Sequence, residues 1–371
     1  MRSLVGGLLF FLALAPFVHA QEVVPDTVTY EKVQVTEVVS QEVRTVPGTS
    51  VTSNYQTLKV KLLEGPGRGS VLTIENDYLS MKEGDVLYVM HTVNSADGRD
   101  VYAVSEPYRL PVVLGFVGLF VLCLFIFGGR QGVRGLVALG LSFFFISYLL
   151  LPGILAGYPP VLVAMGVAAL IIVLGSYITH GFNRTTTTAV VGMLATIAVT
   201  TLLAYVAVHL AHLSGFSSEE TVYLHFDTHG TVDFVGLLLG GILIGVLGVL
   251  YDAAIGQSIA VEELMRAGQH LSAREVYSRA LRIGREHIGA LVNTLAIAYV
   301  GAALPLLLLF KVSYTQSLEV TLNQEIFATE ILRTMIGGIG IILAVPITTA
   351  IAVWMLHGRD YSGNPEEAHH H

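Results

Sequence analysis

The stretch from Phe234 to Phe310 decides the fold. It opens with an apolar run, FVGLLLGGILIGVLGVL (234–250), and an acid, Asp252, follows before the apolar character ends. AAIGQSIAV then leads into a charged segment, EELMRAGQHLSAREVYSRALRIGREH (262–287), and into a second apolar run, IGALVNTLAIAYVGAALPLLLLF (288–310). Each apolar run has close to the roughly 20 residues that a helix needs to cross a bilayer. We therefore predict two membrane helices, joined by a charged helix, with one carboxylate inside the bilayer.

The composition of the whole chain supports a membrane protein. Of its 371 residues, 53% are hydrophobic and only 13% are charged, whereas soluble domains carry about 25% charged residues. The net charge is −8 and there is no basic run, so we expect a lipid bilayer and no nucleic acid as partner. The single cysteine, Cys123, excludes an internal disulfide and a cysteine metal cluster.

The two ends of the chain have recognisable patterns. Residues 1–20 combine one arginine, a short apolar core and a final VHA, which predicts a signal peptide. The alternative is a retained membrane anchor, and either would place the next segment outside the cytoplasm. At the other end, residues 358–371 form a tail whose AHHH ending resembles the remnant of a purification tag, so its histidines are excluded from all chemistry.

Residues 21–110 have the pattern of a small β domain. Leu58, Val60 and Leu62 alternate with lysines, as in a half-buried strand. Asp97-Gly98 predicts a hairpin turn. About five short strands in this segment suggest a small closed barrel, similar to an OB-fold. We expect a binding or packing module rather than an enzyme here.

The segment 111–357 is predicted to be a transmembrane domain of about seven helices. The apolar runs cover 111–128, 133–151, 160–178, 188–211, 234–256, 288–310 and 335–356. Most of the lysines and arginines after Leu110 fall in alternate connections or in the tail: Arg130, Arg134, Arg184, Arg266, Arg274, Arg279, Arg282, Arg285 and Arg359. The positive-inside rule places these on the cytoplasmic side, with the β domain outside and the C-terminus inside.

The charged segment 262–287 is predicted to be an amphipathic helix at the cytoplasmic surface. Ser272 and Glu275 have the spacing of a capping box. The side chains of Tyr277 and Leu281 lie on one predicted face, and arginines lie on another. The segment either connects two spans or couples the protein to an inner partner or to anionic lipid.

Several polar residues are predicted to lie within the spans, and they are the candidate ion-binding or transport site. They are Asp252, Gln257, Ser258, Asn293, Thr348 and Thr349. Pro346 frees a backbone carbonyl, so these groups could converge on an oxygen-rich cluster for a proton or a hard cation. The alternative is that the amide and hydroxyl groups are only hydrogen-bonding contacts between helices.

Other chemistry is weakly supported by the sequence. An outer connection contains a group of possible transition-metal ligands, although their spacing matches no fixed motif: His209, His212, His225, Asp227 and His229. HExxH, GxSxG and P-loop motifs are absent from the sequence, so we expect neither an enzyme nor a cofactor.

Several long motifs occur in order: THGFNRTTTTA, HLSGFSSEE, LGVLYDAAIGQSIAVEEL, LSAREVYSRALRIGREHIGALVNTLAIAYVGAALPLLLLF and EILRTMIGGIGIILAVPITTAIA. Through these motifs the chain resembles the YibE/F family of bacterial membrane proteins. The resemblance covers about 110–357 and implies a multi-pass protein of the bacterial inner membrane, but it implies no activity. The family typically has two adjacent acids where this chain has Tyr251-Asp252, which weakens a carboxylate-pair mechanism. A more distant similarity to resistance-nodulation-division transporters and to SecD/SecF suggests proton coupling by analogy.

Two functions follow as expectations. The first is a transporter or channel-like permease for an ion or small solute, with Asp252 as the titratable group. The second is a non-transporting assembly factor of the cell envelope, whose β domain binds a protein or a wall component. In either case the glycine-rich helices favour a homo-oligomer.

Overall fold

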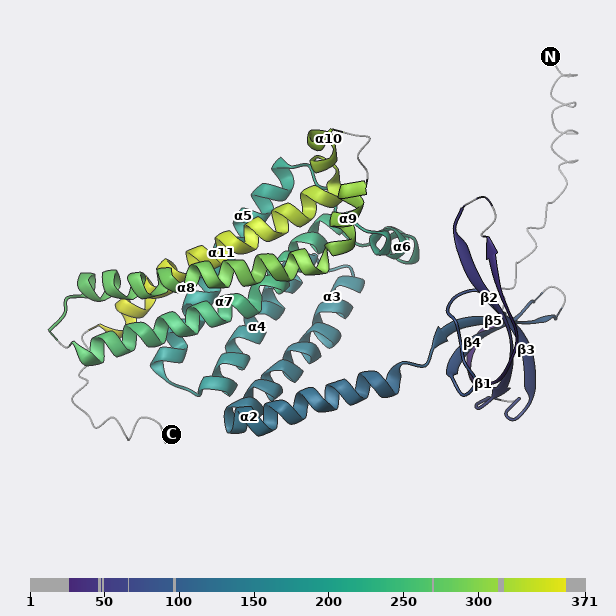
Figure 1. Ribbon diagram of the computed structural model, residues 1–371. Helices are drawn as coiled ribbons and strands as arrows, with labels where there is room; N and C mark the ends of the chain where they lie inside the picture. Colours follow the sequence, from purple (N-terminus) through teal and green to yellow (C-terminus); the bar gives the residue numbers. More distant parts are fainter. Residues whose placement is uncertain are drawn as a thin grey trace, which may run out of the picture. The chain divides into compact units, whose positions relative to one another are not determined.

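The structure is a computed structural model that describes residues 27–357 except 46, 47, 49, 66, 96, 97, 269 and 313–316 (Figure 1). The predicted signal peptide, the C-terminal tail and Asp97 of the predicted hairpin lie outside these described residues. The chain divides into two compact units, Met1–Phe120 and Val121–His371, each with a hydrophobic core of its own.

The first unit is a curled antiparallel sheet with the strand order β3-β2-β1-β4-β5. The strands are β1 (Thr27–Thr45), β2 (Thr52–Leu62), β3 (Val71–Asn76), β4 (Val86–Val93) and β5 (Asp100–Pro107). Strands β4, β1, β2 and β3 have the spatial order of a Greek key. The two edge strands, β3 and β5, contact each other, so the sheet closes into a half-barrel.

The core of the sheet follows the predicted alternation. Leu58, Val60 and Leu62 are at most 1% exposed, while the intervening Lys59 points outward and pairs with Glu37 at 2.7 Å. Val33 and Val35 of β1 complete the same core. The period of two in β2 therefore predicts the inner face correctly, because successive side chains of a strand point to opposite faces.

The second unit is a bundle of long apolar helices, and α5, α7, α8 and α11 run side by side in it (Figure 1). The elements are α2 (Leu110–Phe145), the π-helix η1 (Ile146–Leu150), α3 (Leu151–Leu155), α4 (Pro160–His180), α5 (Arg184–Leu210), α6 (Glu219–Asp227), α7 (Phe234–Ala267), α8 (Ala273–Ala302), α9 (Leu304–Val312), α10 (Leu318–Leu322) and α11 (Glu325–Leu356). Helix α11 packs against α5, α7 and α8, and α4 packs against α7.

Five helical segments of the described chain are long and apolar enough to cross a membrane, and the bent pair α8–α9 would make a sixth. The chain is therefore a membrane protein. The runs predicted over 111–128 and 133–151 belong to one apolar segment, Leu110–Leu155, which is interrupted by a non-helical Gly129 (φ 51, ψ −137).

The run predicted over 288–310 is also not one straight helix, because α8 and α9 meet at 66°. Pro305 lies in the first turn of α9 and has no N–H to donate to the carbonyl four residues before it, which explains the break.

The separate helix predicted over 262–287 does not form as such. Residues 262–267 end α7, and residues 273–287 are the first half of α8, which continues without a break to Ala302. The predicted capping box is confirmed, with Ser272 and Glu275 bonding reciprocally at the start of α8.

The face that α8 buries is shifted by one position from the predicted one. Val276 and Ala280 are at most 1% exposed and belong to a core cluster with residues of α7 and α11, whereas Tyr277 is half-buried. This half of α8 is therefore packed on the bundle, because its small residues allow close approach to two other helices.

Candidate functional site

The predicted polar residues separate into a buried group and an exposed group. Gln257 is 4% exposed, and Ser258, Thr348 and Thr349 are fully buried. Asp252 on α7 and Asn293 on α8 are both exposed. The structure therefore does not gather all six residues into one sheltered oxygen-rich cluster.

Helix geometry explains the separation of Asp252 from Gln257. Five positions along an α-helix correspond to a rotation of about 140°, so the two side chains leave α7 in nearly opposite directions. Asp252 is 18 positions after Phe234 in a helix of 34 residues, or about 27 Å along a helix of about 51 Å. The expectation that neighbouring helices shelter the carboxylate is wrong for this chain by itself, because Asp252 is exposed.

Gln257 sits where three helices meet. Its Nε2 atom donates to the carbonyl of Ala280 in α8 at 2.7 Å. A methyl group at Gly284 of α8 would lie 2.6 Å from the Oε1 atom of Gln257 and 2.4 Å from Val345 of α11. The Thr349 hydroxyl donates to the carbonyl of the same Val345. Gln257 therefore links α7 to α8 at a tight helix junction, whereas the hydroxyl of Thr349 is paired within α11.

Buried hydroxyl groups also line the helix interfaces of this unit. Thr196, Thr200 and Thr349 each donate to the carbonyl four residues earlier. The hydroxyl of Thr348 is equally buried but has no partner among the described residues, and the same holds for that of Ser258. Such groups are candidates for contact with a passing ion or water, since an unsatisfied buried hydroxyl is unfavourable.

A polar cavity of about 600 Å³ opens at the end of the bundle where α4 stops, α5 begins and α7 continues. Its ionisable lining comprises His180, Arg134, Arg184, Arg266, Glu262 and Glu263. Asp252 interacts electrostatically with His180, and the rings of His180 and Tyr251 are 5.9 Å apart. The His180–Asp252 pair thus lies at the edge of this cavity.

Local sequence positions the cavity walls. Gly181, with φ 77, turns the chain after α4, and the Asn183 side chain caps α5 by accepting from the Thr186 N–H at 2.7 Å. On α7, Glu262 pairs with Arg266 at 3.3 Å and accepts a hydrogen bond from Thr185. Sequence reasoning missed this site, and the signal that could have found it is the polar run THGFNRTTTT between two apolar segments.

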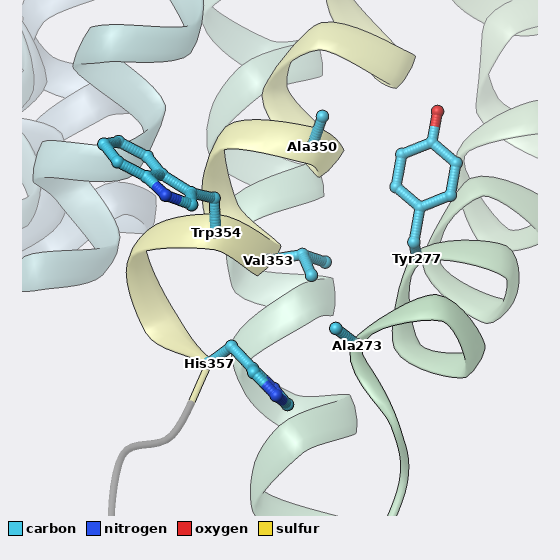
Figure 2. Close-up of a pocket in the computed structure, with 6 residues that line it drawn as sticks. All are labelled: Ala273, Tyr277, Ala350, Val353, Trp354 and His357. Carbon is cyan, nitrogen blue, oxygen red and sulfur yellow. The ribbon is translucent and has the colours of Figure 1, made fainter.

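Two apolar cavities lie beside the last turns of α11. One, of about 390 Å³, is lined by Ala273 and Tyr277 of α8 and by Val353 of α11, among others. Figure 2 shows these side chains on one side of α11, with the Trp354 indole directed to the other side. A second cavity, of about 430 Å³, lies between Trp354 and the first turn of α5, where Arg184 and Thr187 line it.

The histidine-rich connection does not form a metal site. His209 contacts the carbonyl of Tyr205 at 2.8 Å, and His225 packs among the rings of Phe216 and Phe234. Across the described part of the chain, no group of three or more His, Cys, Asp or Glu side chains, whether here or with His212, Asp227 and His229, is arranged to hold a metal ion.

The β unit contains a polar cluster that the sequence does not reveal. His91 lies between Glu31 (Nδ1–Oε1 3.3 Å) and Asp100 (Nε2–Oδ1 2.9 Å) and stacks on Tyr102 at 4.3 Å. Burial, and then the charges of Glu31 and Asp100, raise the pKa of the Tyr102 hydroxyl. With both ring nitrogens engaged, His91 ties β1, β4 and β5 together.

Comparison with known proteins identifies the helical unit. A family model described as YibE/F-like protein matches residues 116–358, which is more than half of the chain and includes every residue of the polar cavity. No curated protein and no solved structure matches the chain. The match confirms the resemblance carried by the long motifs of the sequence. The chain belongs to the family of YibE/F-like proteins.

Proposed function

We propose that this membrane protein is a permease for an ion or small solute, and that protons are coupled to it through His180 and Asp252. The observation that carries the proposal is the polar cavity of about 600 Å³ at the end of the bundle, where α4 stops, α5 begins and α7 continues. Ionisable side chains are rare among membrane helices, and where they line a cavity they typically mark a path for ions or protons.

The buried hydroxyls of Ser258 and Thr348 give a second line of support. They occur on α7, which lines the cavity, and on α11, which packs against α5 and α7, and they lack partners within the described residues. A water molecule or ion that crossed the bundle would supply the missing hydrogen bonds. Asp252 then acts at the mouth of the path.

Proton uptake into proteoliposomes tests the proposal. With a valinomycin-induced potassium diffusion potential and an internal pH dye, the wild-type protein should acidify or alkalinise the lumen faster than empty vesicles. The rate should fall at least about tenfold for Asp252→Asn, because one protonation site is lost. Asp227→Asn, an exposed acid of α6, is the matched control and should keep the wild-type rate. A wild-type rate in Asp252→Asn, with normal folding, would remove Asp252 from the mechanism.

We also propose seven membrane spans. A straight helix of 46 residues, the length of the segment Leu110–Leu155, would be about 69 Å long, roughly twice the thickness of the hydrocarbon core. The break at Gly129 divides it, and Gly132 packs so closely on Leu124 that a methyl group there would lie 2.3 Å from the Leu124 carbonyl oxygen. If Leu110–Leu155 makes two antiparallel spans, the five apolar segments become six spans. The bent α8–α9 pair is then the seventh.

The Greek-key order of the half-barrel supports an OB-like β domain. The distribution of arginines supports a bacterial inner-membrane protein with this domain outside and the C-terminus in the cytoplasm.

A second candidate function is an envelope assembly factor, which a feature of the β unit favours. Residues 40–45 of β1 pair only with β2 among the described strands, so they form a two-stranded arm (Figure 1). Val43 of this arm is 66% exposed, and Val39, immediately before it, is 48% exposed. A free edge with exposed valines is suited to strand addition by a partner protein. Val43→Lys should abolish cross-linking of such a partner in cells while leaving proton flux unchanged, and unchanged cross-linking would reject the arm.

Self-association is proposed on one face of α7. Gly236 and Gly240 pack on α4, close to Pro160 and Ala164, but a methyl group added at Gly248 or Gly256 would meet no atom within 4 Å among the described residues. These two glycines flank the exposed Asp252, so a second copy of the chain on this face would shelter the carboxylate. The double variant Cys123→Ser, Gly248→Cys should form a disulfide between two copies of the chain under oxidation. A product that stays monomeric would argue against this face of α7.

A further inference from the structure

The geometry points to a binding site for an anionic phospholipid at the first turn of α5, with the phosphate held by Arg184 and an acyl chain lying beside Trp354. This inference does not rest on the proposed permease activity, because it concerns a structural lipid and not a transported solute, but the headgroup would share the polar cavity with the proposed path. It rests on three features of the end of the bundle: two adjoining cavities of different polarity, uncompensated positive charge, and an exposed aromatic side chain.

Arg184 lies between a polar cavity and an apolar one. It lines the cavity of about 600 Å³ together with Arg134 and Asn183, and it also lines the cavity of about 430 Å³ together with Trp354 and Met355. A free phosphate ion would use only the first cavity. A phospholipid has a charged headgroup joined to an apolar chain, so it is the occupant that fits both.

The charge of the polar cavity favours a phosphate group. Arg266 is paired with Glu262 at 3.3 Å, but no ion pair of the described residues involves Arg134 or Arg184. Glu263 is the remaining acid of the lining, and Asp252 at the edge of the cavity interacts with His180, which leaves Arg134 and Arg184 against the Glu263 carboxylate. Arg184 is also the first residue of α5, where the helix dipole and the N–H groups without intrahelical acceptors favour an anion.

The apolar side of the site has the character of a membrane interface. Trp354 is 79% exposed and Phe182, on the turn before α5, is 87% exposed. Tryptophan is enriched at the level of lipid headgroups, and basic pockets between membrane helices on the cytoplasmic side bind anionic headgroups. The site therefore combines the two kinds of contact that a bound phospholipid makes.

Trp354 is the only tryptophan of the chain, so its fluorescence reports on this site alone. The full-length protein is reconstituted into phosphatidylcholine vesicles that contain an equal mole fraction of either dibrominated phosphatidylglycerol or dibrominated phosphatidylcholine. We expect the brominated phosphatidylglycerol to quench Trp354 more strongly. Arg184→Gln should lower this preference roughly fivefold, which is the usual contribution of one arginine near an anionic surface.

Arg285→Gln removes an exposed arginine of α8 that lines none of these cavities and should keep the wild-type preference. Arg184→Lys retains the positive charge, so this variant should keep most of the preference for phosphatidylglycerol. The comparison of Arg184→Lys with Arg184→Gln separates loss of lipid binding from misfolding. Equal quenching by the two lipids in the wild-type protein would overturn the inference. So would an equal loss in Arg184→Gln and Arg285→Gln, or displacement of the brominated phosphatidylglycerol by inorganic phosphate.

Discussion

Two buried polar side chains, Gln56 in the β unit and Thr348 in the helical unit, differ in their hydrogen bonding. In the β unit, Gln56 is 1% exposed, and its amide makes four hydrogen bonds, to Gln41, to Asn76 and to both backbone groups of Met81. In the helical unit, Thr348 is fully buried and its hydroxyl has no partner among the described residues.

The difference follows from what the backbone offers in each unit. Turns and strand ends leave N–H and C=O groups free, so a buried amide such as that of Gln56 can be fully paired. In a helix the backbone is already bonded to itself, and a threonine can share only the carbonyl one turn earlier. A satisfied network indicates a role in stability, whereas an unsatisfied hydroxyl indicates a group that is available for another partner.

The largest effect is expected at the satisfied network. Gln56→Ala removes four hydrogen bonds and leaves buried groups of Met81 and Asn76 unpaired, so the β unit should lose about 3 kcal/mol of unfolding free energy. Hydrogen exchange of β2 and β3 amides in the full chain measures this loss. Gln34→Ala, which removes one bond to Gly84, should cost about 1 kcal/mol or less. Equal losses in the two variants would show that the network has no special weight.

A smaller effect is expected where the helices are packed through glycine. Gly284→Ala places a methyl group 2.4 Å from Val345 and 2.6 Å from Gln257, so α8 must move away from α11 at a cost of about 1–3 kcal/mol. Gly289→Ala on the same helix meets nothing within 4 Å and should stabilise it by about 0.5–1 kcal/mol. The sign of the change in melting temperature in detergent distinguishes the two sites, and a fall for both would contradict the packing argument.

The smallest effect is expected at the hydroxyls of the neighbouring residues Thr348 and Thr349, whose removal should change the stability in different directions. Thr349→Val loses the bond to the Val345 carbonyl and should cost about 0.5–1 kcal/mol. Thr348→Val removes an unpaired hydroxyl while keeping the shape of the side chain, so its stability should be unchanged or slightly higher. If Thr348 lies on the proposed path, this stable variant should nevertheless slow proton flux. A marked fall in the melting temperature of Thr348→Val would mean that its hydroxyl has a structural partner.

Local sequence patterns predict much of the architecture. The alternation at Leu58, Val60 and Leu62 identifies the inner face of β2, and the Ser272–Glu275 spacing identifies the start of α8, because both signals act between near neighbours in the chain. The extent of α8 is not predicted, since the change from charged to apolar residues near His287 suggests a boundary. Helical periodicity continues through that change, and composition alone does not end a helix.

The candidate site is predicted only in part. The sequence singles out Gln257, Ser258, Thr348 and Thr349 as polar groups within the spans, and all four are buried, but it groups them with Asp252 and Asn293, which are exposed. It does not show that His180, Arg184 and Glu262, far apart in the chain, line one cavity.

By itself, then, the sequence determined that this is a multi-pass membrane protein with a small β domain, because hydrophobic length and alternation are local properties. It also determined the family, because the long motifs occur in order along the chain. Only the tertiary structure decided which side of α7 carries Asp252 to the surface and which polar groups meet at the end of α4. Those outcomes depend on how helices rotate and pack against one another, and that is set by contacts between residues that are distant in sequence.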